Sequence, residues 1–234
     1  MEEIESLIFK YLTMSKPKIL VFASGTSYGG GSGFENLVES TKNDILHAEI
    51  VGVVSNHCFG GVRMKADILG IPFIHFPSPW TENQYHKIAD DSGADFFALS
   101  GWLKQVVGLD LTTKFNQRTV FNIHPGPLPK FGGKNFYGHH VHEAVIKSFE
   151  KGEITETEIN MHFVDEKIDE GLIFAKIKIP INDDENSETL AKRVLHYEHL
   201  YQPRITNLVV NGMISWDGVN ANSLEIPEHY SVLQ

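Results

Sequence analysis

Hydrophobic residues in the first half of the chain fall into short continuous runs, separated by segments with a helical period. The runs are rich in Val, Ile, Leu and Phe and stand at 18–23, 49–54, 72–75, 95–100 and 119–121. Runs of this length are typical of parallel strands that are covered on both faces. Apolar residues at helical spacing lie between them, at 34–38, 60–70 and 80–92. This alternation over residues 18–124 predicts a parallel sheet with right-handed crossovers.

The pattern changes in the second half of the chain. Residues 157–164 and 173–179 alternate apolar with polar positions, which predicts two half-buried strands. The charged segment 165–171 between them predicts a hairpin loop. Helices are predicted over 139–149 and from near Ser187, with a kink or break at Pro203 because proline lacks a backbone N–H. The predicted fold class is therefore α/β, with a mostly parallel sheet, helices on both faces and an antiparallel hairpin in the C-terminal part.

Composition and charge exclude several classes of protein. The 234 residues are 41% hydrophobic and 21% charged, as in an ordinary globular protein. A formal net charge of −10 argues against a general nucleic-acid binder but allows a small anionic substrate. The single Cys58 cannot form an intrachain disulfide. We find no apolar run near the roughly 20 residues of a membrane span and no basic secretory leader, so we expect a cytoplasmic protein without a membrane partner.

A glycine-rich segment, residues 24–33, follows the first strand and precedes the first helix of the sheet. Free backbone N–H groups and a helix N-terminus in this arrangement can bind an anion. The segment lacks the Gly-Lys-Ser/Thr of a nucleoside-triphosphate site and has no clean Gly-x-Gly-x-x-Gly. From glycine content alone, a flexible connection is the alternative.

The stretch from Asn122 to Pro129 carries the clearest chemistry. Three prolines in five residues break a strand at the carboxyl edge of the predicted sheet, where ligand sites of open α/β sheets lie. Asn122 and His124 are two residues apart, so both point to one side of an extended chain. An amide and an imidazole placed together could polarise a carbonyl and move a proton. A strand-end turn with a surface histidine is the alternative.

Three histidines, His139, His140 and His142, fall in the first turn of the helix predicted over 139–149. Their closeness invites a metal site, but metal sites usually need carboxylate or further His or Cys partners at defined spacing. We expect a ligand-facing or solvated helix start and no metal.

Several motifs together resemble one family, the phosphoribosylglycinamide formyltransferases, over roughly residues 17–215. The matching pieces, in family order, are Ser24-Gly25 with Gly31-Ser32-Gly33, Val54-Ser55-Asn56, Leu99-Ser100-Gly101-Trp102, Asn122-Ile123-His124-Pro125 with Leu128-Pro129, His162-Phe163-Val164 with Asp169 and Gly171, and Glu198-His199. Asn-x-His-Pro combined with an Asp seven residues after His162 is specific to folate formyl transfer. The resemblance implies a Rossmann-like formyltransferase fold. It divides the chain into an N-terminal extension (1–16), a formyltransferase domain (17–215, with a nucleotide-binding half 17–118 and a folate and catalytic half 119–215) and a C-terminal tail (216–234).

The resemblance also implies the reaction: transfer of the formyl group of 10-formyltetrahydrofolate, a co-substrate, to the amine of glycinamide ribonucleotide in purine biosynthesis. By this resemblance Asn122 donates to the formyl oxygen and His124 is the general acid or base. Asp169 holds His124 and raises its pKa. These roles agree with what the chemistry requires, an oxyanion donor, a proton carrier and an orienting carboxylate.

Binding residues follow from the same resemblance. The acceptor nucleotide would be bound by Gly31, Ser32, Gly33, Pro125 and Glu198. The folate pocket would be lined by Leu103, Lys104, Gln105, Val106, Asn122, Val164, Asp165 and Ile168. Leu103 and Val106 would be apolar in any core, so only the resemblance makes them ligand contacts. A homodimer is left open.

Departures from the family pattern leave other formyl acceptors and other functions as alternatives. Gly33 stands where the family usually has Asn, and Leu195 where a Gln often precedes the Glu by three residues. The alternatives are a formyltransferase acting on another phosphorylated or sugar amine, a formyltetrahydrofolate hydrolase, and a non-enzymatic folate- or nucleotide-binding protein. A formyltetrahydrofolate hydrolase would carry a larger N-terminal domain than residues 1–16. A methionyl-tRNA formyltransferase would carry a basic C-terminal domain. Binding alone would not need Asn122, His124 and Asp169 together.

Overall fold

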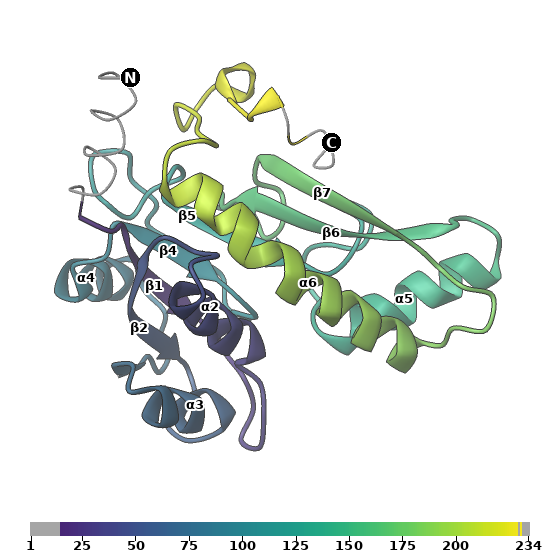
Figure 1. Cartoon of the computed structure of the whole chain (residues 1–234), viewed down its shortest axis with the longest axis horizontal. Helices are drawn as coiled ribbons and strands as arrows, with labels where there is room; N and C mark the ends of the chain where they lie inside the picture. The colour runs from purple at the N-terminus through teal and green to yellow at the C-terminus, as the bar shows by residue number, and fades with distance from the viewer. Residues whose placement is uncertain (1–14, 229, 231–234) are drawn as a thin grey trace.

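A computed structural model describes residues 15–228 and 230 of the chain. Within these residues one seven-stranded sheet has the order β3-β2-β1-β4-β5-β6-β7. The strands are β1 (Lys18–Phe22), β2 (Glu49–Ser55), β3 (Phe73–His75), β4 (Phe96–Leu99), β5 (Val120–His124), β6 (Glu156–Phe163) and β7 (Ile173–Pro180). Strands β1 to β5 pair in parallel, whereas β6 and β7 join as an antiparallel hairpin. The predicted α/β sheet with its C-terminal hairpin is confirmed (Figure 1).

Helices occupy the connections that the periodicity predicts. They are α2 (Ser32–Lys42), α3 (Gly61–Leu69), α4 (Glu82–Ser92), α5 (His139–Glu150) and α6 (Ser187–Val210), with a short 3₁₀ helix, η1 (Ala221–Ser223). Asn186 caps α6, because its side chain accepts from the backbone N–H groups of Glu188 and Thr189. The short helix expected near the N-terminus, within residues 1–14, lies outside the described residues.

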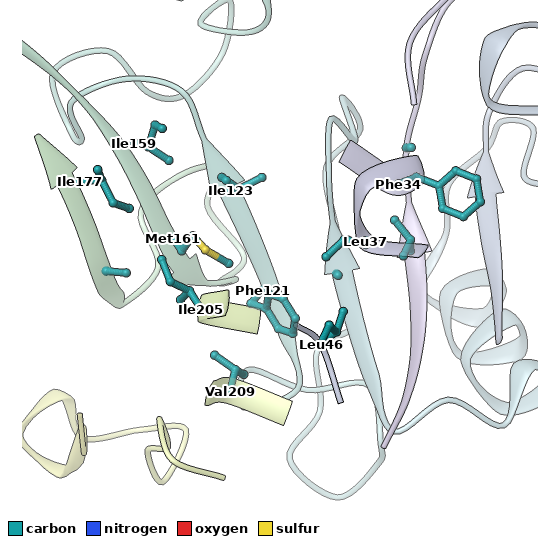
Figure 2. Close-up of a cluster of buried hydrophobic side chains, with 14 of the residues drawn as sticks. Phe34, Leu37, Leu46, Phe121, Ile123, Ile159, Met161, Ile177, Ile205 and Val209 are labelled. Carbon is teal, nitrogen blue, oxygen red and sulfur yellow. The ribbon is translucent and has the colours of Figure 1, made fainter. Parts of the chain in front are cut away.

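Two apolar clusters cover the two faces of the sheet. The larger packs α2, α5 and α6 against one face, and Figure 2 shows Ile123, Met161 and Ile177 of the strands meeting Ile205 and Val209 of α6. The smaller cluster joins α4 and the loops beside it to the other face, with aromatic residues from several segments: Phe22, Phe76, Tyr85, Phe97, Trp102 and Phe115. Helices therefore lie on both faces, as expected for strands that are apolar throughout.

Helix α6 does not break at Pro203, where the sequence predicts a kink or break. The helix is continuous from Ser187 to Val210, and Pro203 is buried within it. Proline has no N–H, so the carbonyl of His199, four residues earlier, loses its helical partner. The side chain of Asn36 in α2 donates to this carbonyl at 2.8 Å. A neighbouring helix therefore satisfies the group that the proline leaves unpaired, and the helix continues.

The strand order reverses between β1 and β4. The chain moves outward from β1 to β2 and β3, then returns to add β4 and β5 on the other side of β1. In open α/β sheets, the carboxyl ends of strands at such a switch point border a crevice that binds ligands. Within residues 15–228 and 230, no helix is long and apolar enough to cross a membrane.

Candidate active site

A cavity of about 720 Å³ lies at this switch point. It is bounded by the loops after β1 and β4, by the carboxyl end of β5, by the start of α5 and by α6. The first two loops are joined directly, because the N–H of Ser24 donates to the carbonyl of Gly101 at 2.9 Å. The hydroxyl of Ser24 in turn accepts from the N–H of Leu103 at 2.9 Å. One space thus joins segments that lie far apart in the sequence.

The glycine-rich segment is a packed turn rather than a loose connection. The Thr26 hydroxyl accepts from the N–H of Gly29 at 2.9 Å. A Cβ on Gly61 would lie 2.4 Å from the backbone of Gly29, so the two loops touch at a distance that only glycine allows. Gly31 caps α2 with φ of 76°, a left-handed conformation that favours glycine. The first bond of α2 runs from Glu35 N–H to Gly31 O. The N–H groups before Glu35 have no acceptors within the helix, and Gly31, Ser32 and Gly33 line the cavity, which is the arrangement of an anion site at a helix start.

Asn122 and His124 lie on the same face of β5. Their neighbours Phe121 and Ile123 point the other way, into the larger apolar cluster. The strand period of two therefore directs the amide and the imidazole to one side of the sheet. His162 on β6 pairs in register with Asn122 and shares that side.

Asp169 comes from the loop between β6 and β7 and folds back over this side of the sheet. Its Oδ2 lies 3.6 Å from Nδ1 of His124 and accepts from the N–H of Gly133 at 3.0 Å. Its Oδ1 lies 3.6 Å from Nε2 of His162 and accepts from the Asn122 side chain at 3.4 Å. The side chain of Asp169 is only 9% exposed. The structure thus brings Asn122, His124 and Asp169 together.

The contacts of His124 determine which nitrogen can take a proton. Nε2 lies 2.8 Å from the carbonyl of Phe131, which can only accept, so Nε2 carries the hydrogen of the neutral ring. Nδ1 is left as the basic nitrogen, and it faces Asp169. Burial lowers the pKa of His124, and the charge of Asp169 opposes that effect without overcoming it. The expected upward effect of Asp169 on the pKa of His124 is therefore confirmed, but burial outweighs it.

Asp169 stays ionised despite its burial. Burial alone would raise its pKa, but the interactions with His162 and His124 and the N–H of Gly133 outweigh that effect, so the pKa is lowered. The site therefore pairs a carboxylate with a neutral imidazole at neutral pH. When His124 takes a proton, its charge appears beside a negative group.

His162 also belongs to this cluster, although the sequence analysis uses it only as part of a matching motif and assigns it no role at the site. Its Nδ1 donates to the carbonyl of Phe163 at 2.9 Å, which leaves Nε2 as an acceptor for the Asn122 amide at 3.1 Å. The second hydrogen of that amide points to Asp169 at the longer distance of 3.4 Å. A carbonyl oxygen entering the cavity would compete with this weaker bond for the Asn122 donor. The register of β6 on β5 brings His162 here, and the sequence alone does not give that register.

The predicted binding residues divide into two groups. Those that line the cavity are Gly31, Ser32, Gly33, Leu103, Lys104, Asn122, Pro125, Ile168 and Glu198. The structure places the other four elsewhere among the described residues. Val106 and Val164 are buried in the smaller apolar cluster, which is the role expected of any core valine. Gln105 donates to the carbonyl of Glu166, and Asp165 accepts from the Glu166 N–H.

Glu198 is the acidic group of the cavity wall on α6. Burial raises its pKa to about 7, far above that of an ordinary glutamate. Its carboxyl group is therefore near half-ionised at neutral pH, and hydroxyl donors from a ligand would favour its charged form.

The three histidines at the start of α5 differ from one another. His139 and His140 are exposed and lie 3.8 and 3.2 Å from Glu143, whereas His142 is only 6% exposed and lines the cavity. Burial lowers the pKa of His142 to about 4, so it is neutral at physiological pH. Across residues 15–228 and 230, no three His, Cys, Asp or Glu side chains are placed to hold a metal ion.

Comparison with known proteins identifies the family of this chain. Residues 17–206 match the family model described as "Formyl transferase". The chain belongs to the formyl transferase family. Two curated members are similar over most of its length, both named phosphoribosylglycinamide formyltransferase, chloroplastic. The protein from Vigna unguiculata is 36% identical over 89% of this chain, and that from Arabidopsis thaliana is 33% identical over 87%. This formyl transferase spans 66% and 70% of their respective lengths.

The fold is shared with solved structures of the family. The glycinamide ribonucleotide transformylase 1 from Symbiobacterium toebii superposes with a TM-score of 0.75 at 23% identity. The match covers 91% of this formyl transferase and 95% of that chain. The arrangement of the sheet, the C-terminal hairpin and the helices around them is therefore the formyltransferase fold.

Proposed function

We propose that this formyl transferase moves the formyl group of 10-formyltetrahydrofolate to the amine of glycinamide ribonucleotide, a step of purine biosynthesis. The observation that carries the proposal is a single cavity. It joins the amide-lined start of α2 to the cluster of Asn122, His124 and Asp169. For the transfer to occur, the phosphorylated amine and the formyl donor have to be bound side by side in the same cavity. The names of the relatives from Vigna unguiculata and Arabidopsis thaliana support this acceptor.

The reaction makes one C–N bond and breaks another. The amine nitrogen of the acceptor attacks the formyl carbon, and the carbonyl oxygen gains negative charge in a tetrahedral intermediate. The bond from that carbon to N10 of the folate then breaks. One proton leaves the attacking amine and one arrives on N10, so the proton count balances. The protein therefore has to stabilise an oxyanion and carry a proton.

Asn122 supplies the oxyanion donor in this scheme. Its amide hydrogen toward Asp169 makes the weaker of its two bonds, 3.4 Å against 3.1 Å to His162. The growing charge on the formyl oxygen draws this hydrogen more strongly than the neutral carbonyl does. Such a donor acts mainly in the transition state, which is what raises turnover rather than binding.

His124 carries the proton. Its lowered pKa keeps Nδ1 free to accept a proton near neutral pH, and Asp169 at 3.6 Å stabilises the imidazolium that forms. The N–H of Nε2 stays bonded to the Phe131 carbonyl and fixes the orientation of the ring. The same imidazolium then returns a proton toward the leaving nitrogen.

The acceptor and the folate approach from opposite sides of this centre. The backbone amides at the start of α2 bind the phosphate, and Glu198 accepts from the ribose hydroxyls. Leu103 and Ile168 offer half-exposed apolar side chains, 47% and 45% exposed, at the edge of the cavity for the flat rings of the folate. In a homodimer of this protein, the interface would leave this cavity open.

An absorbance assay of folate release tests the proposal. The purified protein is mixed with 10-formyltetrahydrofolate and glycinamide ribonucleotide, and tetrahydrofolate formation should depend on both. Release without an acceptor would instead identify a formyltetrahydrofolate hydrolase. Transfer to a sugar amine but not to the ribonucleotide would overturn the acceptor, and ligand binding without any turnover would identify a binding protein.

A further inference from the structure

Gly33, in the first turn of α2, has no room for a side chain. A Cβ built there would lie 2.1 Å from Oγ of Ser100 and 3.3 Å from Oε1 of Gln202. Its φ is not in the left-handed region, so the backbone does not require glycine at this position. The space beside the helix start is filled by two polar groups that come from the loop after β4 and from α6. They occupy the place of a side chain from α2 itself.

The two groups touch each other, and one of them is incompletely bonded. The Ser100 hydroxyl donates to Oε1 of Gln202 at 3.4 Å. Gln202 is 1% exposed, and its Nε2 has no hydrogen-bond partner within the described part of the chain. A buried amide donor without a partner is costly and calls for an explanation. Both side chains line the cavity together with Gly31, Ser32 and Gly33.

We propose that Ser100 and Gln202 form the side-chain arm of the phosphate site at the start of α2. Ser100 contacts the phosphate of the acceptor, and Gln202 is a positioning residue that acts through Ser100. This inference rests on the proposed function for the identity of the acceptor. It does not depend on formyl transfer itself.

The numbers of donors and acceptors require Ser100 and Gln202 to exchange roles when a phosphate binds. An ionised phosphate oxygen only accepts, so Ser100 must turn its hydroxyl hydrogen from Gln202 toward the phosphate. A half-turn of the Gln202 amide, which keeps the shape of the side chain, then lets Nε2 donate to Ser100 Oγ. The result is a chain in which an amide N–H donates to a hydroxyl and the hydroxyl donates to the phosphate. Phosphate binding therefore satisfies the donor that is unpaired in the free protein, and each bond polarises the next.

Binding of ribose 5-phosphate, measured by calorimetry, tests the pair without any formyl donor. Ser100→Ala and Gln202→Met preserve approximate volume, and each should weaken binding by about 10-fold. The double variant should be little weaker than either single variant, because removing one member breaks the whole chain. Ser40→Ala, a buried serine of α2 outside the cavity lining, is the matched control and should bind as the wild type does.

Kinetics give a second readout. The same variants should raise KM for the phosphorylated acceptor by a similar factor while kcat and KM for the folate stay near wild-type values. Unchanged ribose 5-phosphate affinity in either single variant would overturn the inference, as would strictly multiplicative losses or a wild type that does not bind this probe. If the wild type binds the probe and loses it as described but does not formylate glycinamide ribonucleotide, only the proposed function fails.

A paired substitution tests the packing. Gly33→Ala should lower the melting temperature, because its Cβ meets the Ser100 hydroxyl. Gly33→Ala with Ser100→Ala should recover most of the lost melting temperature, since the nearest atoms are then Gln202 Oε1 at 3.3 Å and Ser100 Cβ at 3.4 Å. Phosphate affinity should remain weak in the pair. Recovery of affinity would overturn the role of the hydroxyl.

Discussion

Oδ2 of Asp169 lies 3.6 Å from Nδ1 of His124, the one ring nitrogen that the Phe131 carbonyl leaves without a hydrogen. The carboxylate therefore faces the atom that gains a proton in the proposed reaction. Asp169 is held there by the Gly133 N–H and has a left-handed φ of 59°. A non-glycine residue in this conformation is uncommon, and such residues concentrate at functional sites.

Replacing Asp169 by Asn should preserve the fold and remove most of the activity. The amide keeps the shape of the side chain but cannot stabilise an imidazolium, so kcat should fall by about 10²-fold or more. Steady-state turnover and a melting curve measure the two effects. Glu170→Gln, an exposed neighbour on the same loop, is the control. Near-normal turnover of Asp169→Asn would contradict the role of the carboxylate.

The pH dependence of kcat should report His124. The neutral ring is the active form, and burial lowers its pKa below the ordinary 6.5. Activity should therefore persist as the pH falls through 6.5 and decline only at lower values. Asp169 acts to raise the pKa, so in the residual activity of Asp169→Asn the acidic limb should move to lower pH still. A wild-type limb above pH 6.5 would contradict this account.

The pH dependence of acceptor binding should report Glu198 instead. Burial raises its pKa to about 7, and its carboxylate form accepts ribose hydroxyls better than the protonated form. The KM for the acceptor should therefore fall as the pH rises through about 7, while KM for the folate does not. Glu198→Gln should flatten this dependence and raise KM at high pH. An unchanged profile in Glu198→Gln would assign the limb to another group.

Acid stability should depend on His142. Its folded-state pKa of about 4 lies below the unfolded value near 6.5, so the unfolded chain binds the proton first. The contribution of neutral His142 to the free energy of unfolding is fully present above pH 6.5. It is lost as the pH falls toward 4, and the total loss is about 3 kcal/mol. His142→Gln should reduce the fall in unfolding free energy over that range, measured by denaturant titration. The same slope in both proteins would contradict it.

Asn36 should stabilise α6 because of Pro203. Asn36→Ala leaves the carbonyl of His199 without its 2.8 Å partner and should cost about 1–2 kcal/mol of unfolding free energy. In a Pro203→Ala background the new N–H at position 203 can donate to that carbonyl, so Asn36→Ala should cost less unfolding free energy there. Equal costs in the two backgrounds would show that the bond is unrelated to the proline.

The order of strands and helices follows from the sequence because each element carries its own period. Apolar runs give β1 to β5, and alternation gives β6 and β7 nearly to the residue. The continuity of α6 does not follow in the same way, because Asn36, which satisfies the carbonyl freed by Pro203, lies far away in the chain. Local signals predict local structure, and this partner is not local.

The same distinction applies to the site. Asn122 and His124 can be placed on one face from their spacing alone, and the family resemblance adds Asp169. His162 enters through strand register, and Ser100 and Gln202 through the packing of two loops and a helix around Gly33. The pKa of His124 needs the balance between burial and one nearby charge, which a sequence does not contain.

Activity depends on the register in which β5 pairs with β6, so it reports whether the hairpin has folded correctly. If β6 were shifted by one residue along β5, His162 would point into the apolar core and Met161 or Phe163 would lie opposite Asn122. Such a molecule could keep its secondary structure and bulk dimensions and still be inert. Specific activity per milligram therefore measures correct alignment of this hairpin more sensitively than circular dichroism does.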